Sequence, residues 1–114
     1  MVNFNGTVLE SQKNVLSADN RGFLYGDAVF ETLRVVGQKP LFWEDHYFRL
    51  MASMRLMRME IPMSFTPEFL LKELQKTLVS INSNATRIRL TVFRNSGGRY
   101  LPTSNDVQFL IVSE

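Results

Sequence analysis

The spacing of hydrophobic residues predicts a β-rich first third of the chain. Residues 2–9 indicate a hairpin, because Asn5-Gly6 separates two short apolar runs and tolerates positive φ at both turn positions. Residues 28–36 are rich in β-branched and aromatic side chains, which is typical of a strand. A turn rich in Gly and Pro follows, and residues 41–43 are expected to pair back as a short strand.

From residue 44 to residue 60 the pattern changes to a helical period, and Pro62 is expected to end the helix. Two of its three faces are apolar, so we expect it to be enclosed on more than one side. Successive residues of a helix lie about 100° apart around its axis, which gives three faces here. The first face comprises Tyr47, Leu50, Met51 and Met54, the second comprises Phe48, Ala52 and Met59, and the third, polar face comprises His46, Arg49 and Ser53. The local methionines are interpreted as core filling: Met51, Met54, Met57, Met59 and Met63.

A second helix is predicted by the chemistry of its first turn. Thr66 can cap the helix, Pro67 suits the first helical position, and Glu68 lies against the positive helix end. Phe65 is placed to pack against Leu70 as a hydrophobic staple. The apolar stripe of this helix comprises Leu70, Leu71, Leu74 and Leu78.

The last part of the chain returns to the period of a strand. Residues 86–94 alternate between an apolar face and a face that carries Arg87 and Arg89, and residues 107–112 predict a closing strand. Strands, two helices and further strands follow one another without regular βα alternation. This order predicts an α+β fold, a mainly antiparallel β-sheet with two helices packed on one side.

Composition places the chain among globular proteins. Its 114 residues, 45% hydrophobic and 21% charged, suffice for one domain around a single core. No apolar run approaches 18 residues, and the N-terminus resembles no signal peptide. We therefore expect a cytoplasmic protein with no membrane partner.

The type of basic residue says more than the net charge of +2. Nine of the 13 basic residues are Arg, which favours planar, bidentate recognition of carboxylate or phosphate. These arginines are dispersed over the predicted elements, so nucleic-acid binding is not expected. The absence of Cys and the single His argue against a thiol nucleophile and a metal site.

Arg49 is the first candidate for chemistry, because it lies mid-helix between His46 and Ser53 on the polar face. Held by a rigid helix, its guanidinium could clamp a phosphate through two parallel hydrogen bonds. The alternative is a surface arginine that pairs with Glu60 or with solvent. His46 is interpreted as a structural hydrogen-bonding residue.

The loop after residue 94 is the second candidate. Gly97-Gly98 could allow Arg99 and Tyr100 to fold back over a pocket, with Arg94 at the strand end, which would suit an anionic substrate. An ordinary hairpin loop is the alternative. Upstream, Tyr25, Phe30 and Glu31 could line a pocket, although the two aromatic residues would ordinarily belong to a core.

Three segments together carry a family resemblance: NRGFLYGDAVFETLRV, HYFRL and RIRLTVFRNSGGR, in that order over residues 20–99. They resemble the N-terminal domain of the fold-type IV pyridoxal-phosphate enzymes. That group comprises branched-chain aminotransferases, D-amino-acid transaminases and aminodeoxychorismate lyases. The Ser-Gly-Gly-Arg sequence is most similar to the lyases, whereas Phe-Glu-Thr-Leu-Arg is shared more widely, so the subfamily stays open.

The resemblance implies roles for five residues. Arg49 would contact the phosphate of pyridoxal 5'-phosphate, and Tyr25 and Phe30 would line the substrate pocket. Arg89 and Arg99 would bind substrate carboxylates, with Arg99 commonly reaching the site of a partner subunit. The resemblance therefore also implies a homodimer that acts on an amino acid, a keto acid or aminodeoxychorismate.

Residues 1–114 are thus expected to be the small N-terminal domain of such an enzyme. In the resembled enzymes a further domain carries the Schiff-base lysine, and none of Lys13, Lys39, Lys72 and Lys76 has a desolvated setting that would lower its pKa. We expect no catalytic residue within these 114 residues and an inactive isolated chain. The alternative is a stand-alone, non-catalytic module for self-association or for binding an anionic metabolite.

Overall fold

The computed structural model describes residues 1–10, 14–80 and 85–114. Six strands form one sheet in the order β2-β1-β6-β5-β3-β4, and every neighbouring pair is antiparallel. This confirms the α+β class. The strands are β1 (Val2–Phe4), β2 (Thr7–Leu9), β3 (Ala28–Val36), β4 (Lys39–Pro40), β5 (Arg87–Arg94) and β6 (Val107–Ser113), and the helices are α1 (Arg21–Tyr25), α2 (Trp43–Leu56) and α3 (Pro67–Ser80).

The first hairpin forms as predicted. Asn5 and Gly6 take φ values of 53° and 99° in the turn between β1 and β2. Gly adopts such positive φ values without steric cost, and Asn tolerates them better than most other residues. Strand β1 also pairs with β6, so the hairpin forms one edge of the sheet.

The return strand predicted over residues 41–43 is wrong in position. Strand β4 contains only Lys39 and Pro40, and Leu41 adds one backbone hydrogen bond to Arg34. Phe42 then takes a left-handed conformation (φ 57°), and Trp43 begins α2. The turn therefore leads into the helix at residue 43, one residue earlier than the predicted start at residue 44.

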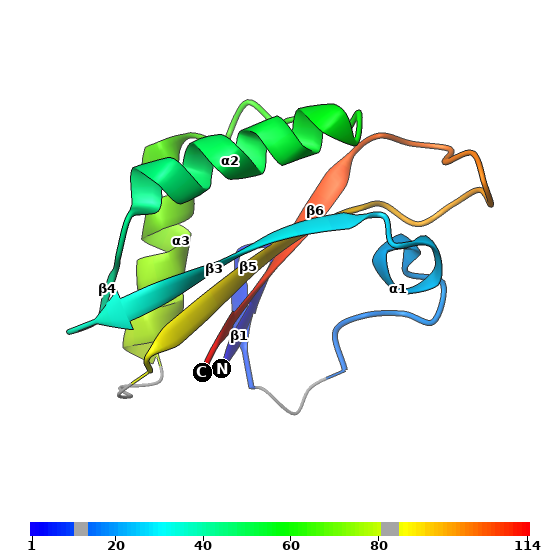
Figure 1. Ribbon diagram of the computed structural model, residues 1–114. Coiled ribbons are helices and arrows are strands. Elements are labelled where there is room, and N and C mark those ends of the chain that lie inside the picture. The colour runs from blue at the N-terminus through cyan, green and yellow to red at the C-terminus, as the bar shows by residue number, and fades with distance from the viewer. Residues whose placement is uncertain (11–13, 81–84) are drawn as a thin grey trace.

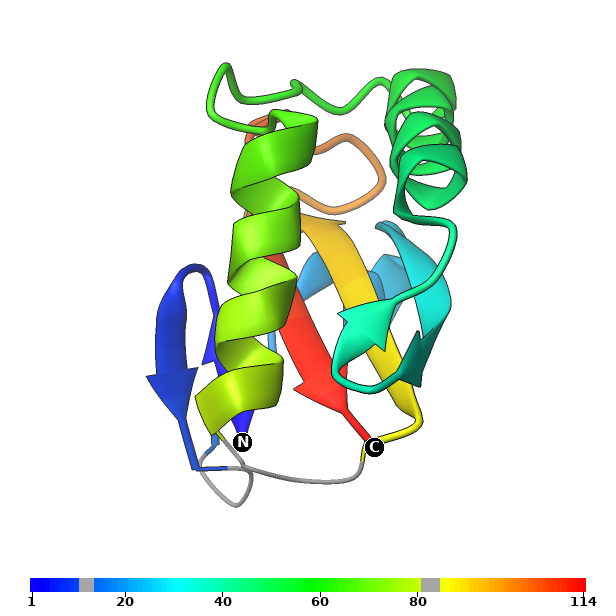
Figure 2. The ribbon, with the colours of Figure 1, turned by 90° about the vertical axis from the view of Figure 1, so that its left-hand side faces the viewer.

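Helices α2 and α3 cover the same face of the sheet and enclose the core (Figures 1 and 2). Helix α3 begins as predicted, with the Thr66 hydroxyl accepting a hydrogen bond from the backbone N–H of Phe69 at 3.0 Å. The apolar stripe of α3 also lies inward. The residues with no more than 2% exposure in this core include Leu33, Leu50, Met54, Leu70, Leu74, Leu78, Ile88, Leu90, Val92 and Ile111.

Helix α2 departs from its prediction in two ways. It ends at Leu56 rather than near Pro62, and Arg58 has a φ of 57°. Only one side is enclosed, because Phe48 on the second apolar face is 64% exposed. The interpretation of the methionines holds for most of them but is wrong for Met63, which is 99% exposed.

The other face of the sheet is only partly covered. Alternation along β5 buries Ile88, Leu90 and Val92 under the two long helices, as predicted, and leaves Arg87 and Arg89 exposed on the opposite face. The short helix α1, which the pattern did not predict, packs on that opposite face at the far end of β5 (Figure 1). Within the described residues, the part of this face around Phe30 and Arg89 is exposed, and it carries these two predicted site residues.

Candidate functional site

The two sides of strand β3 carry different parts of the candidate site. Phe30 is 53% exposed on the open face of the sheet, whereas Glu31 is 5% exposed and contacts α2. Successive side chains of a strand point to opposite faces, so this separation follows from the alternation alone. Phe30 is therefore not the core residue that an aromatic side chain in a strand would ordinarily be.

Arg89 and Phe30 contact each other on the open face. The guanidinium carbon of Arg89 lies 3.9 Å from the centroid of the Phe30 ring, the geometry of a cation–π interaction. Next to this pair is a hollow of about 110 Å³ lined by Thr32, Arg87, Arg89 and Glu114. Two predicted substrate-binding residues thus form one cationic, aromatic surface that suits a carboxylate on an apolar group.

Tyr25 lies at the end of α1. The side chain of Asn20 begins this helix by accepting a hydrogen bond from the backbone N–H of Phe23, and Gly26 ends it in a left-handed conformation. The Tyr25 ring is 43% exposed and lies 4.6 Å from the guanidinium carbon of Arg21. Helix α1 thus holds Tyr25 at the surface against a buried arginine.

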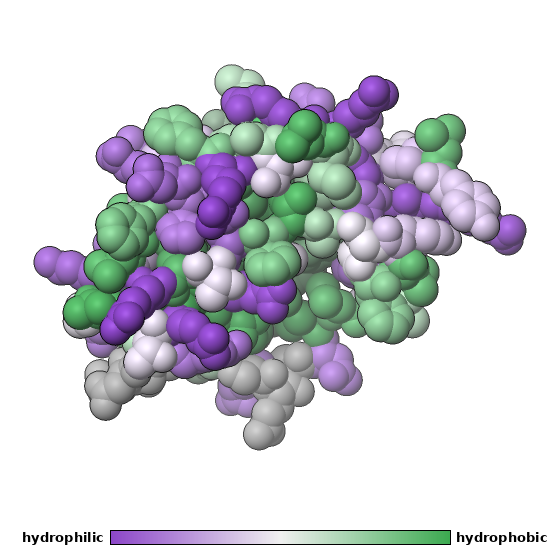
Figure 3. Space-filling view, in the orientation of Figure 1, coloured by the Kyte–Doolittle hydropathy of each residue, from purple (hydrophilic) through white to green (hydrophobic). Residues whose placement is uncertain are grey.

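Helix α1 packs closely against the start of β3 because Gly22 lacks a side chain. A Cβ atom there would lie 3.2 Å from that of Ala28 and 3.0 Å from the Asn20 side-chain oxygen. The outer side of the helix is apolar and exposed, with Phe23 at 80% and Leu24 at 50%. Hydrophobic side chains accordingly gather at this end of the molecule (Figure 3), beside a hollow of about 230 Å³.

Arg49 is held by Glu31. Its Nε lies 3.0 Å and its Nη2 2.7 Å from the same carboxylate oxygen, Oε1. The Glu31 side chain is 5% exposed and that of Arg49 is 67% exposed, so a buried anion anchors an exposed cation. The pairing with Glu60 that we considered as an alternative is therefore wrong, because the partner comes from β3.

The charge of Glu31 is maintained by its neighbours. Burial by itself would raise the pKa of this carboxyl, but the hydrogen bonds from Arg49 and His46 outweigh it, and the pKa lies below its ordinary value. His46 Nδ1 lies 2.6 Å from Glu31 Oε1, which confirms its hydrogen-bonding role. At neutral pH an ionised Glu31 therefore holds the Arg49 guanidinium in place, and the exposed side of that guanidinium can still donate to an anion.

The loop between β5 and β6 extends beyond the ends of these strands (Figure 1), and Arg99 belongs to this loop. Arg99 is exposed, and Tyr100 is 97% exposed, so Tyr100 does not fold back over a pocket of this chain. Arg94 is 5% exposed and ion-paired with Asp27. Our expectation that Arg94 and Arg99 together face an anionic substrate is therefore wrong for Arg94.

The predicted site residues form separate groups within this chain. Phe30 contacts Arg89 on the open face, Arg49 lies with Glu31 on the α2 side, and Tyr25 is linked to the loop of Arg99 through Arg21. Sequence reasoning missed Arg21. It also missed Asp27, its partner, although both stand in the motif NRGFLYGDAVFETLRV, where their charges flank an otherwise apolar stretch.

The described lysines lie at the surface of the molecule. Lys39, Lys72 and Lys76 are exposed, and Lys76 is paired with Glu73, while Lys13 lies outside the described residues. Among the residues that the structure describes there is no group of acidic or His side chains that could hold a metal ion. No helix within those same ranges is long and apolar enough to span a membrane.

Comparisons with known proteins place this geometry in a family. The family model described as amino-transferase class IV matches residues 28–114. The aminodeoxychorismate lyase of Bacillus subtilis is 33% identical over 94 residues, which are 81% of this chain and 31% of that protein. The D-alanine aminotransferase of Bacillus licheniformis is 32% identical over 98 residues, 86% of this chain and 30% of that protein.

A solved structure agrees with these matches. The 4-amino-4-deoxychorismate lyase from Pseudomonas aeruginosa superimposes with a TM-score of 0.72 at 27% identity, over 90% of this chain and 36% of that one. The chain spans about a third of the length of the curated relatives it matches. The family model covers most of the chain, and the chain therefore belongs to the class IV aminotransferase family.

Proposed function

We propose that residues 1–114 are the small N-terminal domain of a pyridoxal-phosphate-dependent class IV aminotransferase or of the related aminodeoxychorismate lyase. The observation that carries the proposal is the pair of Arg49 and Glu31. A solvent-exposed guanidinium is held on a helix by a buried carboxylate, in a chain whose relatives include both kinds of enzyme. The pair gives this domain a site for the phosphate of the cofactor.

The residues present fit a phosphate group. Within the described chain, the contacts of Arg49 with Glu31 use Nε and Nη2, which leaves the donors of Nη1 for an anion. Glu31 raises the pKa of Arg49 further, so the guanidinium stays charged. When bound, pyridoxal 5'-phosphate would supply the electron sink for the reaction, while this chain binds and orients.

On the substrate side, Phe30 and Tyr25 would shape the pocket and Arg89 would bind a carboxylate. The stacking of Arg89 on Phe30 supports this role, because the ring restricts the guanidinium and leaves its edge for hydrogen bonds. Arg99 would bind a further carboxylate in the site of a partner subunit, which fits its place on a projecting loop. The substrate would be an amino acid, a keto acid or aminodeoxychorismate.

The proposed enzyme is a cytoplasmic homodimer without nucleic-acid or membrane partners. The cofactor lysine would come from a second domain, since Lys39, Lys72 and Lys76 are exposed and none of them is desolvated. We accordingly propose that the 114 residues alone are inactive. Their contribution is to hold the phosphate and to position carboxylate groups.

The test is cofactor affinity in the enzyme that combines this chain with a lysine-bearing second domain. Arg49→Gln should weaken pyridoxal 5'-phosphate binding by about 10- to 100-fold, the equivalent of one charge-assisted hydrogen bond or two. Arg55→Gln, which removes an exposed arginine from the same helix, is the matched control.

The phosphate-free aldehyde pyridoxal separates a phosphate contact from a general defect. Arg49→Gln should leave pyridoxal binding within about twofold of the wild type, because only the phosphate loses its partner. If Arg49→Gln and Arg55→Gln bind pyridoxal 5'-phosphate equally well, Arg49 does not hold the phosphate.

A further inference from the structure

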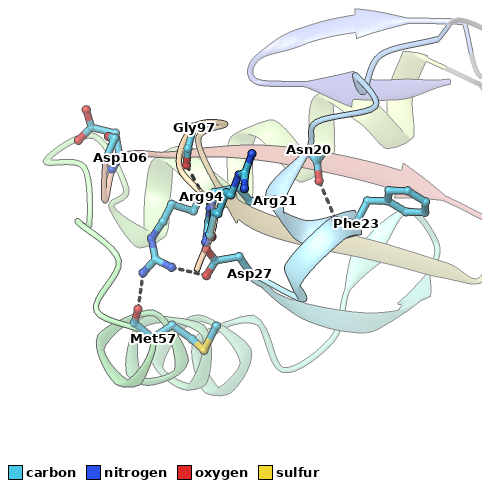
Figure 4. Close-up of polar contacts among 10 residues, drawn as sticks. Asn20, Arg21, Phe23, Asp27, Met57, Arg94, Gly97 and Asp106 are labelled. Carbon is cyan, nitrogen blue, oxygen red and sulfur yellow. Dashed lines mark hydrogen bonds and ion pairs between the residues drawn. The ribbon is translucent and has the colours of Figure 1, made fainter. Parts of the chain in front are cut away.

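Three buried charged residues outside the proposed site form a cluster: Arg21, Asp27 and Arg94, which are 3%, 6% and 5% exposed. They meet where α1, the start of β3 and the end of β5 come together (Figure 4). Burying a charged side chain costs free energy unless the charge is paired and hydrogen-bonded. Each of these three charges is therefore expected to have a polar partner.

Asp27 lies between the two arginines and uses a different oxygen for each. Arg21 Nε donates to its Oδ2 at 2.7 Å, and Arg94 Nη1 donates to its Oδ1 (Figure 4). Arg94 Nη2 in turn donates to the backbone carbonyl of Met57. Asp27 therefore sets the orientation of the Arg21 guanidinium, while Arg94 fixes Asp27.

The remaining donors of Arg21 reach the loop between β5 and β6. Nη1 donates to the carbonyl oxygens of Gly97 at 3.1 Å and Arg99 at 2.8 Å. These two carbonyls flank Gly98, and both glycines have positive φ values, 125° and 78°. The buried guanidinium of Arg21 thus fixes the backbone before and after Gly98, and glycine is the residue type with the greatest backbone freedom.

The tip of this loop has little apolar packing within the described residues. Tyr100 is 97% and Leu101 82% exposed, so apolar packing contributes almost nothing there. The base is closed by a backbone hydrogen bond from Asn95 to Asp106, and a bridge between Gly98 and Pro102 folds the tip upon itself. Nearer the base, Ser96 donates to Asp19 at 3.4 Å and the carbonyl of Asn105 accepts from the backbone N–H of Glu60 at 2.8 Å. At the tip, the hydrogen bonds to the carbonyls of Gly97 and Arg99 come from Arg21 of α1.

We propose that Arg21 is a positioning residue for Arg99 and that Asp27 orients Arg21. By holding the carbonyl of Arg99, the Arg21 guanidinium determines where the exposed Arg99 side chain is presented. The functional half of this inference rests on the proposed role of Arg99 as a carboxylate-binding residue. The structural half concerns the loop alone and can be measured in the absence of cofactor.

Hydrogen exchange of the 114-residue chain tests the structural half. In Arg21→Lys, amides of residues 97–101 should exchange at least about tenfold faster, the factor for losing one charge-assisted hydrogen bond. Amides of α3 and of the β1–β2 hairpin should stay within about twofold, since the change is local. The control Arg87→Lys alters an exposed arginine of β5 that pairs with Glu114.

Arg21→Lys is chosen because it keeps a positive charge beside Asp27 and so preserves the fold where Arg21→Gln could unfold it. It loses the planar fork that spans Asp27 and the two carbonyls. Unchanged exchange at residues 97–101, or equal acceleration in α3, would overturn the inference, because Arg21 would then be either irrelevant to the loop or a general stabilising residue.

Kinetics of the cofactor-loaded enzyme test the functional half. Arg21→Lys should raise the KM for a substrate that carries the carboxylate bound by Arg99 by about 5- to 20-fold, and kcat should change by less than about threefold. Arg99→Gln should raise KM at least as much. In the Arg99→Gln background, Arg21→Lys should have no further effect, because both changes remove one interaction.

The outcomes separate this inference from the proposed function. If Arg21→Lys raises KM equally with and without Arg99, Arg21 does not act through Arg99 and the inference is overturned. If Arg99→Gln leaves KM unchanged, the carboxylate role of Arg99 fails, and with it the functional half. The exchange measurement decides the structural half in either case.

Discussion

Arg49 and Glu31 are 18 residues apart in the chain, and their side chains lie 2.7 Å apart between Nη2 and Oε1. One comes from helix α2 and the other from strand β3. Because Glu31 is buried and Arg49 is exposed, Glu31 fixes the Arg49 guanidinium while leaving it accessible to a ligand. This relationship distinguishes Arg49 from an ordinary surface arginine on a helix.

Removing the charge of Glu31 should destabilise the chain. In Glu31→Gln the amide would place N–H donors near the donors of Arg49 or His46, and the free energy of unfolding should fall by about 1–3 kcal/mol. Urea unfolding measures the loss. Glu60→Gln is the control, because Glu60 is exposed, and it should change stability by less than about 0.5 kcal/mol. Equal losses in both variants would mean that Glu31 is not a buried anchor.

Acid should weaken the fold through two buried carboxyls. Burial opposes the ionisation of Asp27, but the hydrogen bonds from Arg94 and Arg21 outweigh it and lower the pKa of Asp27. Burial likewise opposes the ionisation of Glu31, and the hydrogen bonds from Arg49 and His46 lower the pKa of Glu31. In the unfolded chain Asp27 and Glu31 have their ordinary pKa values, 3.8 and 4.5. As the pH falls, these two groups are therefore protonated in the unfolded chain before they are protonated in the folded chain. Their stabilisation is fully present above those values and is lost as the pH falls through the lowered ones.

Urea midpoints between pH 6 and pH 2 measure this acid sensitivity. Asp27→Asn should flatten the acid limb, because one of the two groups no longer titrates. Asp106→Asn, at an exposed position, should leave the limb as steep as in the wild type. An acid limb that Asp27→Asn does not change would contradict the lowered pKa of Asp27.

Core packing of α2 is tested by two leucines of the same helix. Leu50 is fully buried and Leu56 is 86% exposed. Leu50→Ala should lower the free energy of unfolding by about 2–5 kcal/mol, because the transfer of the side chain is lost and a cavity is left. Leu56→Ala should change it by less than about 0.5 kcal/mol. Similar losses would show that α2 does not pack through the face described above.

The start of α3 depends on the hydroxyl of Thr66. Thr66→Ala should cost about 1 kcal/mol of stability, because the backbone N–H of Phe69 loses its acceptor. Thr66→Ser keeps the hydroxyl and should retain most of the stability. The comparison by thermal unfolding would speak against a capping role if serine were as unfavourable as alanine.

The chemistry of the lysines gives a prediction for this chain alone. Treatment with pyridoxal 5'-phosphate and borohydride should label Lys39 and Lys72 at low and comparable levels, since both are exposed, and Lys76 no more than these, since its amine is paired with Glu73. Peptide mapping after intact-mass analysis locates the labels. Stoichiometric labelling of a single lysine would contradict the proposal that the cofactor lysine lies in another domain.

Local patterns predicted much of the fold. The Asn5-Gly6 turn, the capped start of α3 and the alternation of β5 depend on residues that are close in sequence, and all three are confirmed. The same reasoning failed where an apolar residue could be buried or exposed with the same local pattern. Phe48 and Met63 occupy such positions, and both are exposed.

The candidate site was only partly predictable for the same reason. The motifs singled out Arg49 and Arg99 but could not supply their surroundings. Arg94 and Arg89 lie on one strand in the same charged, alternating segment, yet one is buried beside Asp27 and the other is exposed on Phe30. The alternation places them on opposite sides of β5, but the partners that bury Arg94, Asp27 and the carbonyl of Met57, come from outside the strand, and the local pattern does not contain them.

The sequence by itself determined the strands, the two long helices, the arginine-rich chemistry and the family resemblance, because periodicity, turn residues and motifs act over a few neighbouring positions. Only the tertiary structure decided which charges are paired. Glu31 meets Arg49, and Arg21 meets the carbonyl of Arg99, across 18 and 78 residues of chain. Such pairs form because packing of the sheet and helices brings distant groups into a low-dielectric interior, where an unpaired charge is costly.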